Sequence, residues 1–129
     1  MSDTSSTFED LEVWKLARDL RKMISSLVKT FPADEKYRLT DQMIRASRSV
    51  TANIAEGYGR YHYQENIQFC RQSRGSLYEI LDHLTVALNE GYIIEKIFND
   101  LREDVFEIIK KLNGYIQYLK KRKNSQLVD

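Results

Sequence analysis

Residues 98–119 read FNDLREDVFEIIKKLNGYIQYL, and their apolar side chains recur at alternating intervals of three and four residues. Because an α-helix has about 3.6 residues per turn, side chains with this spacing fall on one stripe of a helix. The alternation is typical of helices that pack side by side in left-handed bundles. We therefore expect a helix that begins near Glu95 and buries Phe98, Leu101, Val105, Ile108, Leu112, Tyr115 and Leu119.

Three earlier segments repeat this spacing, and the residues between them are suited to ending helices. Residues 6–10 offer hydroxyl and carboxylate groups that can cap a first helix, and Pro32 ends that helix and starts the second. The second helix ends at residues 57–59, and a third covers about 62–89 with Gly91 as its C-terminal cap. The expected inward positions are Val13, Ala17, Leu20, Ile24, Leu27 and Phe31, then Leu39, Met43, Ala46, Val50 and Ile54, then Ile67, Cys70, Leu77, Leu81, Leu84 and Leu88.

Four such segments joined by short connections predict an all-α protein, an antiparallel up-down-up-down four-helix bundle. The alternative arrangement is a pair of long hairpins that pack against a second chain. The bundle domain is expected over residues 8–122, with flexible ends at 1–7 and 123–129.

The composition of the chain narrows the classes of protein to which it can belong. Its 129 residues suit one domain, and 42% hydrophobic with 30% charged residues is ordinary for a globular protein. The net charge of +1 means that binding to nucleic acid must come from local clusters of basic residues. A single cysteine, Cys70, and the lack of a signal peptide or a long apolar run indicate a cytoplasmic protein.

A row of polar residues follows the second helix along one edge of its apolar stripe. At this edge the row would face a neighbouring helix, another subunit or a ligand. One interpretation is that these groups form hydrogen bonds across helices and fix register or oligomeric state. The other interpretations are a surface for a ligand or nucleic acid and, as a third, a catalytic site. The row consists of Gln42, Arg45, Ser49, Asn53 and Glu56.

The third helix contains a matching irregularity at Arg74, which falls inside the expected apolar stripe. An unpaired buried charge is costly, so this guanidinium must reach solvent or an anion. Glu56 is one candidate partner, and Arg45 with Glu79 forms a second candidate pair.

Two local clusters of basic residues could contact nucleic acid. The first is Arg60-Tyr61-His62-Tyr63, with Tyr58 and Arg48 near it, and it combines cations for phosphates with aromatic rings for stacking on bases. The second is the run Lys120, Lys121, Arg122 and Lys123 at the end of the fourth helix, where cations also complement the helix dipole. The competing interpretation of both clusters is a solvated helix end without a ligand.

The sequence offers little that is typical of an enzyme. His62 and His83 belong to no recognisable metal-binding motif, and Cys70 lies in an apolar stripe without a basic residue beside it. We expect no catalytic residues, no metal and no cofactor.

Several motifs resemble one known family, over about residues 8–122. They are FEDLEVWKLA at residues 8–17, FPADEKYRLTDQMIRASRSVTANIAEGYGR at residues 31–60, SRGSLYEI at residues 73–80 and EGYI at residues 90–93. Together they are similar to the proteins encoded in intervening sequences of bacterial 23S ribosomal RNA genes. Relatives of that family include the accessory variability determinant protein of diversity-generating retroelements.

The resemblance implies a four-helix protomer that assembles into a cyclic homopentamer. It further implies structural importance for Arg45, Asn53, Glu56, Gly57 and Gly59. In the retroelement branch it implies contact with a reverse transcriptase and with nucleic acid.

Taken together, these expectations describe a non-enzymatic accessory or scaffold protein. Its partners would be copies of itself, RNA or DNA, or a nucleic-acid enzyme such as a reverse transcriptase. The alternative is a protein–protein adaptor with no nucleic-acid role.

Overall fold

The computed structural model describes residues 6–128, with side chains as far as residue 125. Four long helices account for most of this part of the chain, and it contains no β-strand. They are α1 (Glu12–Leu27), α2 (Leu39–Tyr58), α3 (Tyr63–Asn89) and α4 (Glu95–Val128), with short 3-10 helices η2 (Phe8–Asp10), η3 (Val28–Thr30) and η4 (Ala33–Glu35).

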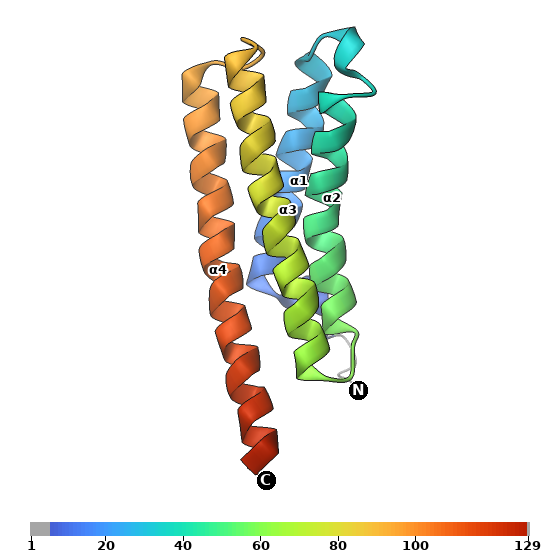
Figure 1. Ribbon diagram of the computed structural model, residues 1–129, viewed down its shortest axis with the longest axis vertical. Coiled ribbons are helices and arrows are strands. Elements are labelled where there is room, and N and C mark those ends of the chain that lie inside the picture. The colour runs from blue at the N-terminus through green and yellow to red at the C-terminus, as the bar shows by residue number, and fades with distance from the viewer. Residues whose placement is uncertain (1–5, 129) are drawn as a thin grey trace.

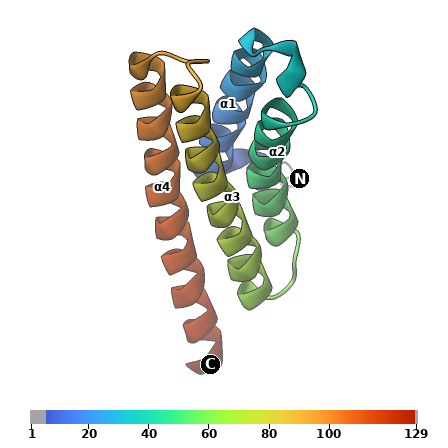
Figure 2. The same ribbon diagram turned by 45° about the horizontal axis from the view of Figure 1, so that its top comes forward.

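The four long helices lie side by side around one core (Figure 1). Each helix packs against the next one in sequence, and α1 also packs against α4. The α1–α2 and α3–α4 connections lie at the same end of the molecule, and the α2–α3 connection lies at the other end (Figure 1). The last turns of α4 extend past the other helices at that second end, as Figures 1 and 2 both show.

The core confirms the expected apolar stripes. All five inward positions predicted for α2 are buried, as are most of those predicted for the other three helices. The predicted positions at the margins, including Leu27, Leu81 and Tyr115, are partly buried and pack against the core. Further buried side chains come from positions that the predicted stripes omit, namely Val28, Ile80, Ala87, Ile93, Ile109 and Ile116.

Helix α3 corrects the prediction that Arg74 lies in the apolar stripe. Ser73 occupies the buried position instead, with no exposed surface, and its hydroxyl donates a hydrogen bond of 2.8 Å to the Val50 carbonyl of α2. A small residue at this point lets the two helices approach closely. Arg74 is only partly buried, and its Nη1 donates to Asn113 Oδ1 of α4 at 2.7 Å.

The predicted capping residues do cap a helix, but it is the short η2. The Thr7 hydroxyl accepts the Glu9 N–H at 3.1 Å, and the Asp10 carboxylate accepts the Thr7 N–H at the same distance. This reciprocal pair is a capping box. Helix α1 follows after Leu11.

Pro32 separates the first two long helices less directly than predicted. Helix α1 ends at Leu27, and η3 continues the chain to Thr30. After Pro32 the chain forms η4, and α2 begins only at Leu39. Glu35 then links the α1–α2 connection to the α3–α4 connection. Its Oε1 accepts a hydrogen bond from the Leu39 N–H at 3.3 Å, and its Oε2 accepts one from the Tyr92 hydroxyl at 2.7 Å.

The ends of α3 and α4 differ in how well they were predicted. Gly91 has a φ of 77°, a left-handed conformation that glycine adopts without strain, and it closes α3 as expected. Helix α4, however, continues to Val128 and so includes most of the 123–129 segment that was predicted to be a flexible tail. The segment at 1–5 lies outside the described residues.

Candidate nucleic-acid interface

A cleft lies at the end of the bundle where α2 passes into α3. Its volume is about 310 Å³, and it opens between the α2–α3 connection and the later turns of α4. Six of its nine lining residues are aromatic. The lining consists of Tyr58, Arg60, Tyr61, His62, Tyr63, Asn66, Tyr115, Tyr118 and Leu119.

Gly57 brings α2 and α3 together beside this cleft. A β-carbon at Gly57 would lie 2.6 Å from Asn66 Oδ1 and 2.9 Å from Phe69 Cβ. Real β-carbons do not approach other heavy atoms so closely, so only glycine allows this contact without a shift of the helices. The close approach fixes where the first turn of α3 lies, and this turn contributes Tyr63 and Asn66 to the cleft.

The inner part of the cleft contains a small hydrogen-bonded group. Asn66 is buried, and its Nδ2 donates to the Tyr115 hydroxyl at 3.2 Å. The thiol of Cys70 donates to Asn66 Oδ1 at 3.6 Å. Burial raises the pKa of Tyr115, and it raises the pKa of the Cys70 thiol to about 12. Both groups therefore carry their protons at neutral pH.

The structure brings the two predicted basic clusters to the same place. Arg122 Nε donates to the Tyr63 hydroxyl at 3.5 Å, and Lys123 Nζ donates to Gln64 Oε1 at 2.7 Å. The hydrogen bond to Tyr63 raises the pKa of the Arg122 guanidinium. Within residues 6–125, none of Lys120, Lys121, Arg122 and Lys123 pairs with a carboxylate, so the run keeps its positive charge beside the tyrosines.

The other two predicted cations differ from this run. Arg60 lines the cleft, but its guanidinium pairs with Glu56 at 3.3 Å and Glu65 at 3.8 Å, and it lies over the Phe69 ring. Its charge is therefore partly balanced by protein groups. Arg48 is exposed on α2, ten residues before Tyr58, which corresponds to about 15 Å along the helix axis. It does not line the cleft, contrary to the grouping predicted from the sequence.

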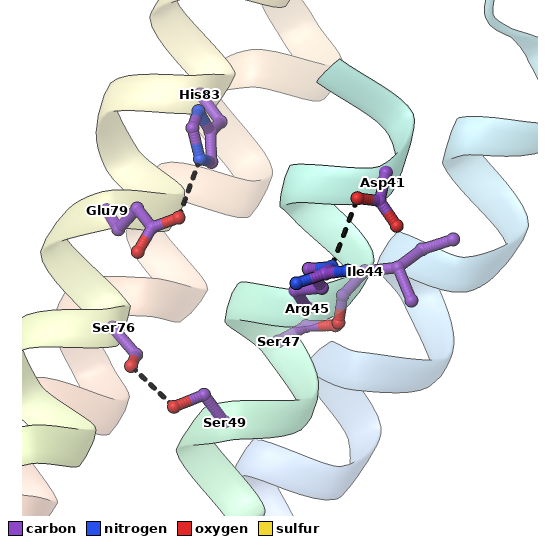
Figure 3. Close-up of polar contacts among 8 residues, drawn as sticks. All are labelled: Asp41, Ile44, Arg45, Ser47, Ser49, Ser76, Glu79 and His83. Atoms are coloured by element: carbon purple, nitrogen blue, oxygen red, sulfur yellow. Dashed lines mark hydrogen bonds and ion pairs between the residues drawn. The ribbon is translucent and has the colours of Figure 1, made fainter. Parts of the chain in front are cut away.

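Two members of the polar row, Arg45 and Ser49, lie on the side of α2 that faces α3 (Figure 3). One contact in the row crosses between helices, from the Ser76 hydroxyl to the Ser49 hydroxyl at 2.9 Å. Asn53 Nδ2 donates back to the Ser49 side chain at 3.0 Å, within the same helix. Gln42 is exposed.

Both ion pairs predicted across the helices are wrong. Arg45 pairs with Asp41 at 3.0 Å, and Glu79 lies 2.9 Å from His83 Nε2, as Figure 3 shows. Glu56 binds Arg60 rather than Arg74. In each case the acid and its partner are four residues apart in sequence, within one helix for Asp41–Arg45 and Glu79–His83 and across the end of α2 for Glu56–Arg60. The row is therefore satisfied mainly within its own helix and remains open to solvent.

Sequence reasoning missed four residues of the cleft. Asn66 was not singled out, Tyr115 and Leu119 were assigned to the core, and Tyr118 was not considered as part of a site. The spacing of Tyr115 and Tyr118 was an available signal, because residues three apart share a helix face and this face leads directly to the basic run. Their rings are nearly parallel, with centroids 6.2 Å apart.

Among the described residues, no group of three or more histidine, cysteine, aspartate or glutamate side chains is arranged to hold a metal ion. None of the helices in this part of the chain has both the length and the apolar character that crossing a bilayer requires.

Comparisons with known proteins give the family of the chain. No curated protein matches the sequence significantly. A crystal structure of a protein of unknown function from the S23 ribosomal protein family of Bacteroides thetaiotaomicron has a similar fold, with a TM-score of 0.75. The two sequences are 22% identical, and the alignment covers 81% of this chain and 95% of the other. The family model described as 23S rRNA-intervening sequence protein matches residues 9–114. The chain belongs to this family.

Proposed function

We propose that this protein is a non-enzymatic accessory protein that binds nucleic acid at the end of its bundle and assembles with copies of itself. The protomer is an antiparallel up-down-up-down bundle that acts without a metal or cofactor, in the cytoplasm. The partners of the assembly are RNA or DNA, or an enzyme that acts on them, such as a reverse transcriptase.

The observation that carries the proposal is the meeting of the tyrosine-rich α2–α3 connection with the basic run of α4. The two segments are about sixty residues apart in sequence, yet Arg122 contacts Tyr63 and Lys123 contacts Gln64. Cations beside exposed aromatic rings are the combination that single-stranded nucleic acid binding uses, because phosphates pair with the cations and bases stack on the rings. A solvated helix end would need no such aromatic partner.

Self-association is proposed from the polar row and from the family. Arg45 and Glu56 are exposed, and each pairs with a residue four positions away in sequence rather than with another long helix, so this surface is open for contact with another subunit. A cyclic homopentamer would place five copies of the basic run in one particle. Five weak sites that engage one nucleic acid together bind far more tightly than a single site.

The test is the salt dependence of nucleic-acid binding. Removing all four cations by the combined substitutions Lys120→Ala, Lys121→Ala, Arg122→Ala and Lys123→Ala should weaken binding to single-stranded RNA. It should also reduce the slope of log affinity against log salt by about three, since each phosphate contact contributes about 0.7 for single strands. Fluorescence anisotropy over a salt series measures both effects.

A variant of equal charge provides the control. Lys29, Lys36 and Lys96 lie in or beside the connections at the opposite end of the bundle, Lys22 lies in the second half of α1, and all four are exposed. Replacing these four by alanine changes the net charge equally and should leave the slope almost unchanged. If the wild-type protein binds neither RNA nor DNA even at low salt, the proposal is wrong and the adaptor alternative takes its place.

A further inference from the structure

We propose that the cleft binds one unpaired nucleotide, with the base between the tyrosines of the α2–α3 connection and those of α4, and with an adjacent phosphate at Arg122. This inference rests on the proposed function and makes it specific, because it predicts a preference for single-stranded over duplex nucleic acid. The relevant walls are formed by Tyr61 and His62 on one side and by Tyr115 and Tyr118 on the other.

The size of the cleft suits a single planar group. Ligand pockets span about 300 to 1,000 Å³, and a cleft of about 310 Å³ lies at the lower end of that range. Aromatic rings of its lining come both from the α2–α3 connection and from α4, so a flat ring that enters the cleft can contact aromatic surface. A stack of several bases, or the outside of a duplex, does not fit such a space.

The aromatic rings at the cleft are unusually open to solvent for such large apolar groups. Tyr61 is 92% exposed and Tyr118 is 55% exposed. The Tyr61 ring lies nearly perpendicular to the His62 ring, with centroids 4.9 Å apart, so the two rings are not stacked face to face. Bases stack readily on such rings, and stacking does not depend strongly on which base is present.

The hydroxyl groups inside the cleft are arranged to donate hydrogen bonds. Tyr115 accepts a hydrogen bond from Asn66, and Tyr63 accepts one from Arg122, so each oxygen already uses an acceptor site. Neither hydroxyl donates to a protein acceptor within the described part of the chain. Each can therefore donate its proton to a carbonyl or ring nitrogen on the edge of a base. The raised pKa of Tyr115 keeps its proton in place.

The charge at the rim selects an anionic ligand. The guanidinium of Arg122 reaches the cleft through Tyr63, and Lys123 is held nearby by the neutral Gln64 side chain. Because their hydrogen-bond partners are uncharged, both cations remain available for a phosphate. A nucleotide that places its base in the cleft and its phosphate at the rim must have its base unstacked from the neighbouring bases. Such unstacked bases occur in single strands, loops and bulges.

The experiment compares single-stranded and duplex RNA as ligands for single-site variants. The probe is a 12-nucleotide RNA that carries one 2-aminopurine, used alone and annealed to its complement. We expect tighter binding of the single strand, quenching of the 2-aminopurine on binding, and loss of about tenfold in single-strand affinity for Tyr118→Ala. Tyr118→Phe keeps the ring and should bind as the wild type does.

Tyr37 offers a matched control, because it is 83% exposed and lies in the α1–α2 connection at the other end of the bundle. Tyr37→Ala should change neither affinity nor quenching.

Equal affinity for single strand and duplex would overturn the inference. Wild-type affinity and quenching in both Tyr61→Ala and Tyr118→Ala would also overturn it. If the basic-run variant still loses binding in that case, the proposed function stands without it. Absence of binding at low salt by every form of the probe and by DNA of the same sequence would refute both.

Discussion

Gly57 is the residue on which the packing beside the cleft depends most directly. Gly57→Ala would place a β-carbon against Asn66 Oδ1 and Phe69 Cβ, so α2 and α3 must move apart. Overpacking of this kind costs about 1–3 kcal/mol of unfolding free energy. Chemical denaturation followed by circular dichroism measures the loss.

Gly75 provides the control for this substitution, because it lies inside α3 and a β-carbon there would meet nothing within 4 Å. Gly75→Ala should stabilise the protein by up to about 1 kcal/mol, since alanine is the better helix former. Equal effects of the two substitutions would contradict the assignment of Gly57 as a packing glycine.

Cys70 should be chemically inert in the folded protein. It has no exposed surface, and burial raises the pKa of its thiol to about 12, so the reactive thiolate is almost absent at pH 8. We expect negligible labelling by a thiol reagent in native buffer and complete labelling of one thiol per chain in denaturant. Rapid native labelling would mean that the packing of α3 near Asn66 opens readily.

At the scale of single residues, sequence patterns located the core better than they located polar contacts. The apolar periodicity depends only on helix geometry, so positions such as Met43 and Val105 were predicted correctly. Partners for Arg45 and Arg74 depended on competition between several nearby groups. A carboxylate four residues away competes better than one on another helix, and periodicity alone contains no information about that competition.

Among the elements, the two connections at one end of the bundle are joined through Glu35 and Tyr92. The hydrogen bond to Glu35, together with partial burial, raises the pKa of Tyr92 to about 12. The Phe31 and Tyr92 rings also pack, with centroids 5.4 Å apart. Tyr92→Phe keeps this ring contact and removes only the hydroxyl, so it should lower the unfolding free energy by the contribution of this one hydrogen bond. Urea denaturation at neutral pH measures the change.

The hydrogen bond from Tyr92 to Glu35 should make the unfolding free energy depend on pH in the alkaline range. Because the pKa of Tyr92 is raised from about 10 in the unfolded chain to about 12 in the folded protein, the folded state binds this proton more tightly. The stabilisation that the Tyr92 proton gives to the folded state is complete below about pH 10 and is lost as the pH rises toward about 12. The difference in stability between wild type and Tyr92→Phe should therefore shrink between pH 9 and pH 11.5. A constant difference would show that the hydroxyl does not act through this bond.

The order and character of the helices were predictable, whereas several of their ends were not. Gly91 ended α3 as expected because its left-handed backbone strongly favours glycine. Pro32 gave only an approximate boundary, since it stops a helix without starting the next one at once. The polar composition after Leu119 indicated fraying, but the Lys123–Gln64 contact holds that part of α4 against α3.

On the scale of the whole molecule, the open polar row can be tested without disturbing the fold. The Arg45 side chain is 79% exposed, and exposed ion pairs contribute little to stability, so Arg45→Ala should change the unfolding free energy by less than about 0.5 kcal/mol. If the row is a subunit interface, the same substitution should lower the particle mass seen by light scattering. The wild-type particle is expected at five times the 15.2 kDa mass of one chain.

The control is Lys96→Ala, which removes a pair of the same length and similar exposure outside the row. It should leave both mass and stability unchanged. A wild-type mass of one chain at high micromolar concentration would refute the proposed assembly. An unchanged mass in Arg45→Ala would place the interface elsewhere on the protomer.

The cleft could not be predicted from the sequence as a single site. Its residues come from segments that are about fifty residues apart, and each segment alone resembles an ordinary helix end. Only the packing of α4 against the start of α3 brings them together, and that depends on where two long helices begin relative to each other. The two clusters were recognisable separately, but their proximity is a property of the fold.

The stretch that matches the family model ends at residue 114, and Tyr115, Tyr118, Leu119 and the four cations follow it. One wall of the cleft is thus encoded outside the matched region, while the opposite wall is encoded inside it. If the cleft binds nucleic acid as proposed, family members that share the matched scaffold but differ after residue 114 would differ in ligand preference, because residues 115–123 supply one side of the proposed binding surface. Exchanging that stretch between family members should then change ligand preference.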